Sequence, residues 1–184
     1  MKTRLAAVAA GLAVALSAFA AVAQEDFPRE GVKGAELNAV FRPKGITFEA
    51  PADQPVVLMD SRYVYGGDAL AGARGDVVLL QQGGHPCQYA MVFDRPAVSF
   101  AFNRSRLVAG PSGVTHPVWT ATAMDGDGHA LSSVREDEIR SYTDVPAQRF
   151  TLTGPGITRI VFWGDDKGFD GFCNVVVDTA DVTY

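Results

Sequence analysis

Histidine and cysteine are scarce in this sequence, and their spacing excludes several kinds of site. Three histidines and two cysteines occur among 184 residues. No H-x-H or H-E-x-x-H motif is present, so the usual ligand pattern of a catalytic zinc centre is missing. His85 and His116 each stand directly before a proline, which indicates loop backbone. A pair of cysteines without C-x-x-C spacing is also a poor set of metal ligands.

Basic residues are outnumbered, since 16 Lys and Arg stand against 21 Asp and Glu for a net charge of −5. Nucleic acid is bound through a basic face that neutralises phosphates, and anionic membrane surfaces attract the same residues. We therefore expect no nucleic-acid partner. No apolar run of spanning length follows residue 23, so we expect that the folded domain is not membrane-embedded.

An export signal is the clearest feature that is present. Two basic residues precede an apolar run over residues 5–22, and Ala21 and Ala23 fit the A-x-A cleavage rule. A membrane anchor is the alternative, but the run is rich in alanine and the cleavage site is well placed. We predict that residues 1–23 are a signal peptide. The mature chain would then carry a net charge of −7 and be periplasmic or secreted.

The two cysteines, Cys87 and Cys173, lie far apart in the sequence. In an oxidising compartment such a pair normally forms a disulfide. Closing a loop of this length stabilises the fold by at most about 4–5 kcal/mol in the chain-entropy model. The alternative is a reactive or metal-bound thiol. We predict a Cys87–Cys173 disulfide.

Most of the chain consists of short runs rich in β-branched and aromatic residues, separated by Gly, Pro, Asp and Asn. This pattern, without any sustained helical period, predicts an all-β protein. The predicted strands are 45–49, 56–60, 76–81, 89–93, 97–103, 118–124, 130–134, 149–153, 158–163 and 173–178, with a stub at 181–184. We expect a two-sheet antiparallel β-sandwich of the jelly-roll type over residues 45–184. Residues 24–44 form a leader or wrapping segment with one short helical turn near 35–41.

Side-chain alternation in three strands predicts one buried and one wet face, as in antiparallel sheets. The buried face is expected to carry the hydrophobic residues Val98, Phe100, Phe102, Phe150, Leu152, Ile160 and Phe162. In the strand 158–163, Trp163 then lies on the opposite face from Ile160 and Phe162.

The segment Met124-Asp-Gly-Asp-Gly-His129 contains two Asp-Gly steps, which are strong hairpin signals. An EF-hand loop is the alternative. Counted from Asp125, Glu136 occupies position 12 as required, but position 6 is Ala130 rather than glycine. We therefore predict a hairpin turn here.

A polar loop follows Trp163 and carries Asp165, Asp166, Phe169 and Asp170. Aromatic faces stack on sugar rings, and carboxylates accept hydrogen bonds from sugar hydroxyls. These five residues are therefore our candidate ligand-binding site. The alternative is that Trp163, like the second tryptophan Trp119, packs in the core.

Several segments have the pattern of a known class of domain: FDRPAVSFAF (93–102), WTATAMDGDG (119–128), FTLTGPGITRIVFWGD (150–165) and NVVVD (174–178). They resemble the galactose-binding-like jelly rolls of exported bacterial proteins, which include carbohydrate-binding modules and discoidin-type domains. The resemblance covers residues 45–184 and lies mainly in core strands and corners. It implies the fold, and no ligand residue carries over from it.

A structural calcium ion is a further implication of this resemblance, because several such domains hold one near the join of their first and last strands. The acidic candidates in this chain are Glu49, Asp178 and Asp181. Ca²⁺ requires several oxygen ligands, so these carboxylates would have to converge. The alternative is that they are solvated acids at strand ends.

Three classes of function remain open on the sequence. We predict an exported, soluble β-sandwich binding module that recognises carbohydrate or another extracellular ligand through its loops. The alternatives are a structural or interaction protein of the cell envelope without a small-molecule site, and a jelly-roll glycosidase or lyase. No recognisable pair of catalytic carboxylates or activated nucleophile supports the last of these.

Overall fold

The computed structural model describes residues 33–60, 77–81, 87–104, 107–108, 115–116, 118–140, 144–164 and 177–184. The predicted signal peptide lies outside these residues. Within them, none of the helices is long and apolar enough to cross a bilayer.

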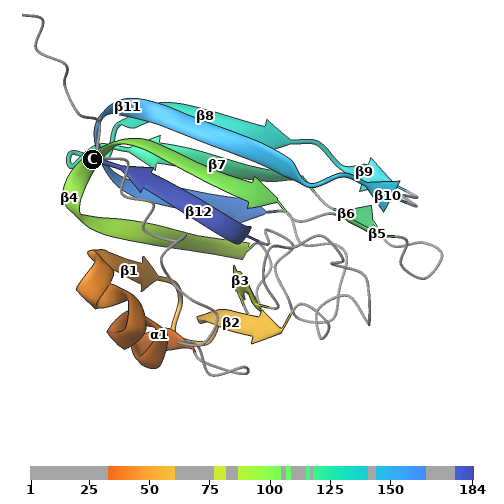
Figure 1. Cartoon of the computed structure of the whole chain (residues 1–184), viewed down its shortest axis with the longest axis horizontal. Coiled ribbons are helices and arrows are strands. Elements are labelled where there is room, and N and C mark those ends of the chain that lie inside the picture. The colour runs from red at the N-terminus through yellow and green to blue at the C-terminus, as the bar shows by residue number, and fades with distance from the viewer. Residues whose placement is uncertain are drawn as a thin grey trace, which may run out of the picture.

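Eight strands of four or more residues form the framework (Figure 1). They are β1 (Ile46–Glu49), β2 (Val56–Asp60), β3 (Val77–Gln81), β4 (Cys87–Arg104), β7 (Trp119–Met124), β8 (Ala130–Glu136), β11 (Gln148–Gly164) and β12 (Val177–Thr183). Four strands of two residues form two small ladders, β5 (Leu107–Val108) with β10 (Asp144–Val145) and β6 (Thr115–His116) with β9 (Ile139–Arg140). The helices are α1 (Gly34–Phe41) and the 3₁₀ turn η2 (Arg42–Lys44).

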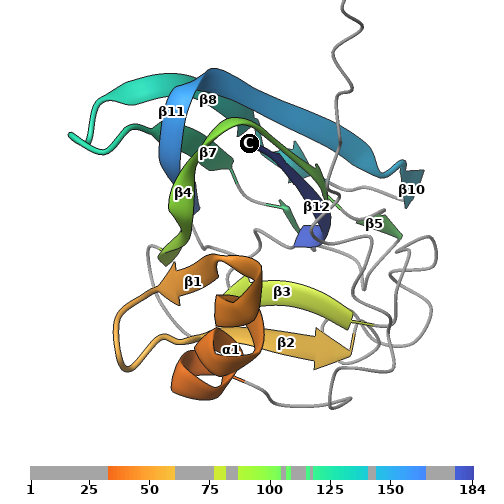
Figure 2. The ribbon, with the colours of Figure 1, turned by 60° about the vertical axis from the view of Figure 1, so that its left-hand side comes forward.

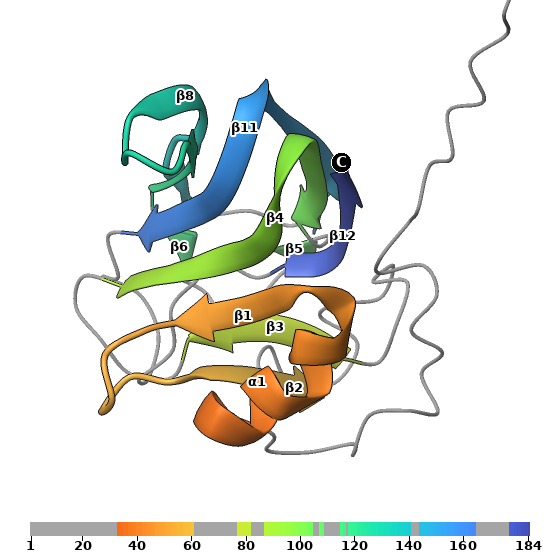
Figure 3. The ribbon, with the colours of Figure 1, turned by 90° about the vertical axis from the view of Figure 1, so that its left-hand side faces the viewer.

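Two layers arise because β4 and β11 are long, pair with each other and bend together (Figures 2 and 3). In the first layer, the first half of β4 lies between β1 and the second half of β11, which continues to β7 and β8. In the second layer, the second half of β4 lies between the first half of β11 and β12, which continues to β3 and β2. All of these pairings are antiparallel, so the predicted all-β antiparallel sandwich is confirmed.

The bend lies where β4 contains Asp94-Arg95-Pro96 and β11 contains Gly154-Pro155-Gly156. The β4–β11 register shifts between Thr153 and Ile157 and again after Ile157, as expected where bulges turn a strand. Gly156 has a φ of 80°, which favours glycine. The sequence predicted two strands in each of these regions, whereas the structure has one bent strand.

The bend also corrects one prediction about the buried face. Phe100 and Phe102 are buried as predicted, but Val98 is 50% exposed. Val98 is the second residue after Pro96 at the corner, and the buried position there is Ala97 instead. The regular alternation of β4 therefore resumes after Val98 and does not include it.

Aromatic side chains join the two layers across a single core. Phe102 of the second layer lies 5.3 Å from Phe162 and 5.7 Å from Trp119, both of the first layer, between ring centroids. Trp119 also meets Phe150 of the second layer edge to face at 4.8 Å. Tyr89 stacks on Phe162 within the first layer. Burial of these rings is the main favourable term that holds the layers together.

Helix α1 closes the core at the edge of β1 (Figure 3). Leu37 and Phe41 are one helical turn apart and are both buried. The Asn38 amide donates to the Phe48 carbonyl and accepts from the Phe48 N–H, so it pairs with β1 as a neighbouring strand would. The helix therefore covers a strand edge that would otherwise be open.

Candidate functional site

Trp163 lies near the end of β11 and points outward. Its side chain is 36% exposed, while Phe162 beside it is fully buried, as the alternation predicted. The β4–β11 register places Gln88 opposite Trp163, and the β7–β11 register places Thr120 on its other side. Arg135 of β8 lies opposite Thr120.

These four residues form one line across the outer face of the first layer, because directly opposed residues of an antiparallel sheet share a face. We call Gln88, Trp163, Thr120 and Arg135 the Trp163 row. It combines an indole ring with an amide, a hydroxyl and a guanidinium. This set can stack on a ring and exchange hydrogen bonds with hydroxyl groups.

The other tryptophan, Trp119, belongs to the core. Packing in the core was the alternative that the sequence left open for both tryptophans. It is 1% exposed, and its indole N–H donates to Oε2 of Glu136 at 2.8 Å. Glu136 also accepts from the Arg104 guanidinium, with the closest contact at 2.9 Å from Nη2 to Oε1. Arg104 in turn donates to the Pro146 carbonyl at 2.9 Å. The buried charges are thus paired and hydrogen-bonded, as burial requires.

Four of the five predicted ligand residues, Asp165, Asp166, Phe169 and Asp170, lie outside the described residues. They follow β11 directly in the chain, and β11 ends with Trp163 and Gly164. Whether these residues and Trp163 act together stays a prediction.

The predicted calcium ligands Glu49 and Asp181 lie on different strands, and each faces an arginine of β11. Glu49 of β1 is paired with Arg159, and Asp181 of β12 with Arg149 at 2.5 Å. The register sets Glu49 opposite Ala90 and Asp181 opposite Ala101 of β4.

In the described part, β1 pairs with β4, and β12 pairs with β3 and β4. The join of first and last strands on which the calcium site depended is thus not among these pairings. The side chain of Asp178 lies outside the described part, so the calcium site stays a prediction.

The predicted disulfide is not tested by the structure. Cys87 is the first residue of β4, where its backbone pairs with Gly164 of β11. Its side chain and the whole of Cys173 lie outside the described residues. The Cys87–Cys173 bond therefore stays a prediction.

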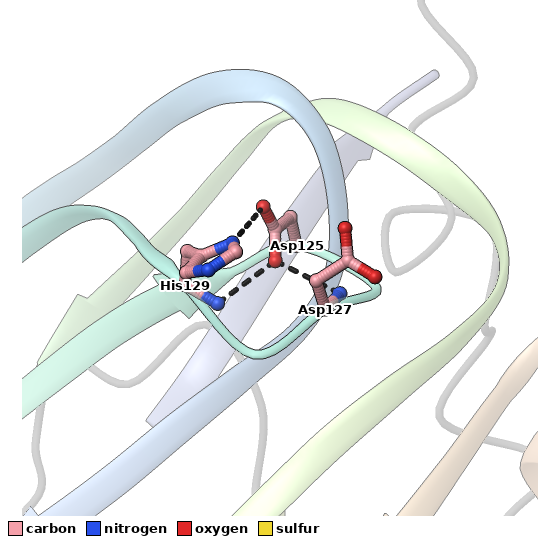
Figure 4. Close-up of side chains that lie close together, drawn as sticks. All are labelled: Asp125, Asp127 and His129. Atoms are coloured by element: carbon pink, nitrogen blue, oxygen red, sulfur yellow. Dashed lines mark hydrogen bonds and ion pairs between the residues drawn. The ribbon is translucent and has the colours of Figure 1, made fainter.

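The hairpin predicted at the two Asp-Gly steps is confirmed, and its tip gathers three side chains that could contact a cation (Figure 4). One ligand atom each of Asp125, Asp127 and His129 lies within 4.8 Å of the others. Carboxylate and imidazole ligands together suit a transition metal such as Zn²⁺ better than Ca²⁺, which prefers oxygen.

The hydrogen bonds within this cluster explain it as a turn. Asp125 Oδ1 accepts from the backbone N–H of Asp127 at 2.9 Å and of His129 at 2.8 Å. Its Oδ2 lies 3.2 Å from Nδ1 of His129. The bond from the His129 backbone is the main cause that lowers the pKa of Asp125 below its usual value. Both carboxylate oxygens of Asp125 are therefore already occupied in fixing the tip.

Sequence reasoning missed the buried polar side chains. Among the residues that the structure describes, these are Gln81, Arg104 and Glu136. The Gln81 amide binds the backbone of Gln88 through both its oxygen and its nitrogen, at 2.7 and 2.9 Å. A polar residue that closes an apolar strand, as Gln81 closes Val77–Leu80, was a weak signal of this kind.

Comparison with known proteins identifies a fold and no family. No protein-family model matches the sequence, and none of the curated proteins matches it. The K2 cleaved adhesin domain of Lys-gingipain is similar in structure, with a TM-score of 0.50 and 11% identity over 88% of this chain and 96% of that chain. At this identity the likeness shows the β-sandwich fold alone.

Two further similar structures have lower scores. The family 32 carbohydrate-binding module of C. perfringens NanJ, in complex with galactose, is 14% identical over 75% of this chain and 93% of that chain, with a TM-score of 0.36. Tailspike protein 4 of bacteriophage CBA120 is 11% identical over 74% of this chain, with a TM-score of 0.38. The chain spans only 19% of that tailspike chain.

Proposed function

We propose that this protein is an exported binding module that recognises carbohydrate or another extracellular ligand at the end of the sandwich where Trp163 lies. One observation carries the proposal, the partial exposure of a tryptophan on the outer face of the sheet. An indole that is partly exposed to water forgoes part of the gain that full burial would bring. A ligand that covers Trp163 would recover that gain.

The loop predicted over residues 165–170 belongs to the same proposal. It follows Trp163 in the chain and offers three carboxylates and a phenyl ring. Carboxylates accept hydrogen bonds from hydroxyl groups, which gives a shallow sugar site its selectivity.

A glycan array tests the ligand class. We expect the purified protein to bind a subset of glycans, Trp163→Ala to lose that binding, and Thr151→Ala to retain it. Thr151 is a suitable control because it is exposed on the second layer, away from Trp163. Silence of the unaltered protein across plant, microbial and host glycans would contradict the carbohydrate proposal and favour an envelope interaction protein.

Export is tested separately in a bacterial host. The proposal expects the protein in the periplasm or medium, with Gln24 as its first residue by N-terminal sequencing. Its intact mass under non-reducing conditions should be two hydrogens lower than after reduction, because Cys87 and Cys173 would be joined. Retention of residues 1–23 on the exported protein would contradict the cleavage.

A further inference from the structure

We infer that the ligand of this protein is an extended, uncharged glycan chain that lies along the Trp163 row, across β4, β11, β7 and β8. This inference rests on the proposed function and specifies its ligand. It places the main binding surface on the outer sheet face rather than in the loops alone.

The dimensions of the row support a chain rather than one terminal sugar. Neighbouring strands lie about 4.8 Å apart, so the four strands of the row span roughly 14 Å. Trp163 stands within this line and not at its end, with Gln88 on one side and Thr120 and Arg135 on the other. A sugar stacked on the indole would therefore have polar groups beyond it in both directions.

Buried polar residues adjoin both ends of the row. At the β4 end, Gln81 is fully buried and binds the backbone N–H and carbonyl of Gln88, the first member. At the β8 end, Glu136 follows Arg135 in the chain and is held by buried Arg104.

These three are the buried residues with amide or charged side chains in the described part of the chain. Burying polar groups costs free energy unless they are well paired, and such networks fix the surrounding backbone. Their position makes the two ends of the row rigid, which reduces the entropy lost when a ligand is bound.

The charges around the row favour an uncharged ligand. Arg135 is paired with Asp137 at 2.9 Å. Arg159, on the same face four residues before Trp163, is paired with Glu49. Both cations are thus already neutralised, and the chain as a whole is acidic at −5. An anionic glycan would have to displace these carboxylates and approach a negative molecule.

Affinity electrophoresis measures directly whether the protein binds uncharged or anionic polysaccharides. The purified protein would be run through gels that contain hydroxyethyl cellulose, xyloglucan, galactomannan or a soluble β-1,3-glucan, and through gels with alginate or polygalacturonate. We expect retardation by at least one of the uncharged polymers and none by the anionic ones. Oligosaccharides of the retarding polymer should compete more strongly as they lengthen, and its monosaccharide should compete weakly.

Four variants locate the surface. Trp163→Ala should weaken binding by about tenfold or more, as for a central aromatic anchor. Gln88→Ala and Arg135→Ala should each weaken it roughly two- to tenfold, the effect of one lost hydrogen bond. Thr151→Ala should have no effect, because Thr151 lies on the other layer. All four positions are exposed, and their melting temperatures would show that the variants are folded.

Results that contradict the inference can be distinguished from results that contradict the proposed function. If a monosaccharide competes as well as a long oligosaccharide, and Gln88→Ala and Arg135→Ala match Thr151→Ala, the inference is overturned while the proposed binding function stands. Retardation by the anionic polymers overturns the choice of an uncharged ligand. If no polymer retards the protein and the glycan array is also silent, both proposals fail. Self-association that depends on Trp163 would assign the face to a second copy of the chain.

Discussion

The two tryptophans lie side by side in the first layer and face opposite ways. Trp119 is opposite Gly164, and its neighbour Thr120 is opposite Trp163. Trp119 points into the core, where its N–H is bound by Glu136, and Trp163 points outward with 36% of its side chain exposed.

This difference in burial indicates that the two tryptophans have different roles. On the inner side of the sheet, the rings of Trp119 pack against Phe102 and Phe150, and its indole N–H donates a hydrogen bond to the Glu136 carboxylate. The outer side covers Trp163 only in part and leaves 36% of it exposed. Trp119 therefore contributes to stability, and Trp163 is available for a ligand.

Trp119→Ala should have the largest effect of the changes considered. It removes the largest buried side chain and leaves Glu136 without one of its donors. We expect a loss of about 3–5 kcal/mol in the free energy of unfolding, measured by urea denaturation. A loss below about 1 kcal/mol would mean that the two tryptophans do not differ as described.

Glu136→Gln should have the next largest effect, because it removes the charge that holds Arg104 in the core. Hydrogen bonds to charged groups contribute about 1.5–3 kcal/mol each, and we expect a loss of that order in urea denaturation. Asp137→Asn is the matched control, since Asp137 is the exposed neighbour and pairs with Arg135 on the surface. Equal effects of the two changes would contradict a special role for the buried pair.

Trp163→Ala should affect ligand binding more than stability, the opposite of what we expect for Trp119→Ala. We expect it to cost about 1–2 kcal/mol in the free energy of unfolding, less than Trp119→Ala, because Trp163 is 36% exposed and Trp119 only 1%. Binding of the glycan should weaken by about tenfold or more, as described above. A drop in stability comparable to that of Trp119→Ala, with binding intact, would show that Trp163 only packs.

We expect the smallest effect on stability at the tip of the β7–β8 hairpin. The tip lies at the other end of the strand that begins with Trp119, so it serves as a site remote from both tryptophans. The pKa of Asp125 is lowered, chiefly by the backbone hydrogen bond from His129. Its stabilising contribution is therefore present above the unfolded-state value of about 3.8 and is lost as the pH falls through the lower folded-state pKa.

A carboxyl carbon titration by NMR measures this shift. The midpoint for Asp125 should lie below 3.8, the value of an unperturbed carboxyl group. Asp125→Asn removes this carboxyl group, while its amide oxygen still accepts the turn hydrogen bonds, so the low-pH step assigned to residue 125 should be absent. A midpoint at or above 3.8 would contradict the hydrogen-bonded tip.

Local patterns predicted much of the fold. Alternation identified Phe150, Leu152, Ile160 and Phe162 as core residues, and the Asp-Gly steps identified the hairpin, because period two and turn chemistry are properties of neighbouring residues. The predicted strand stub at 181–184 and the end of the strand 173–178 are joined in β12. The short helix near residue 35 was also placed correctly.

The sequence predictions that failed concern places where segments distant in the sequence meet in the fold. Pro96 and the Gly154-Pro155-Gly156 corner indicate interrupted strands when each is considered alone. In the structure the two irregular segments are opposite each other in one antiparallel pair, so both strands bend together and continue. Val98 was assigned to the core for the same reason. The buried contacts of Gln81, Arg104 and Glu136 depend on partners that no local pattern reveals.

The sequence by itself determined that this chain is a β-sandwich with alternating faces, and that Trp163 opposes Ile160 and Phe162 on its strand. In the strand of Trp119, the alternate residues Ala121 and Ala123 are apolar but small, and the other face carries threonines, so local polarity was only a weak signal that the Trp119 side is buried. Only the tertiary structure decided that Trp119 lies inside, against Phe150 and Glu136. It also aligned Trp163 with Gln88, Thr120 and Arg135, because register across four strands is fixed by the packing of the whole core.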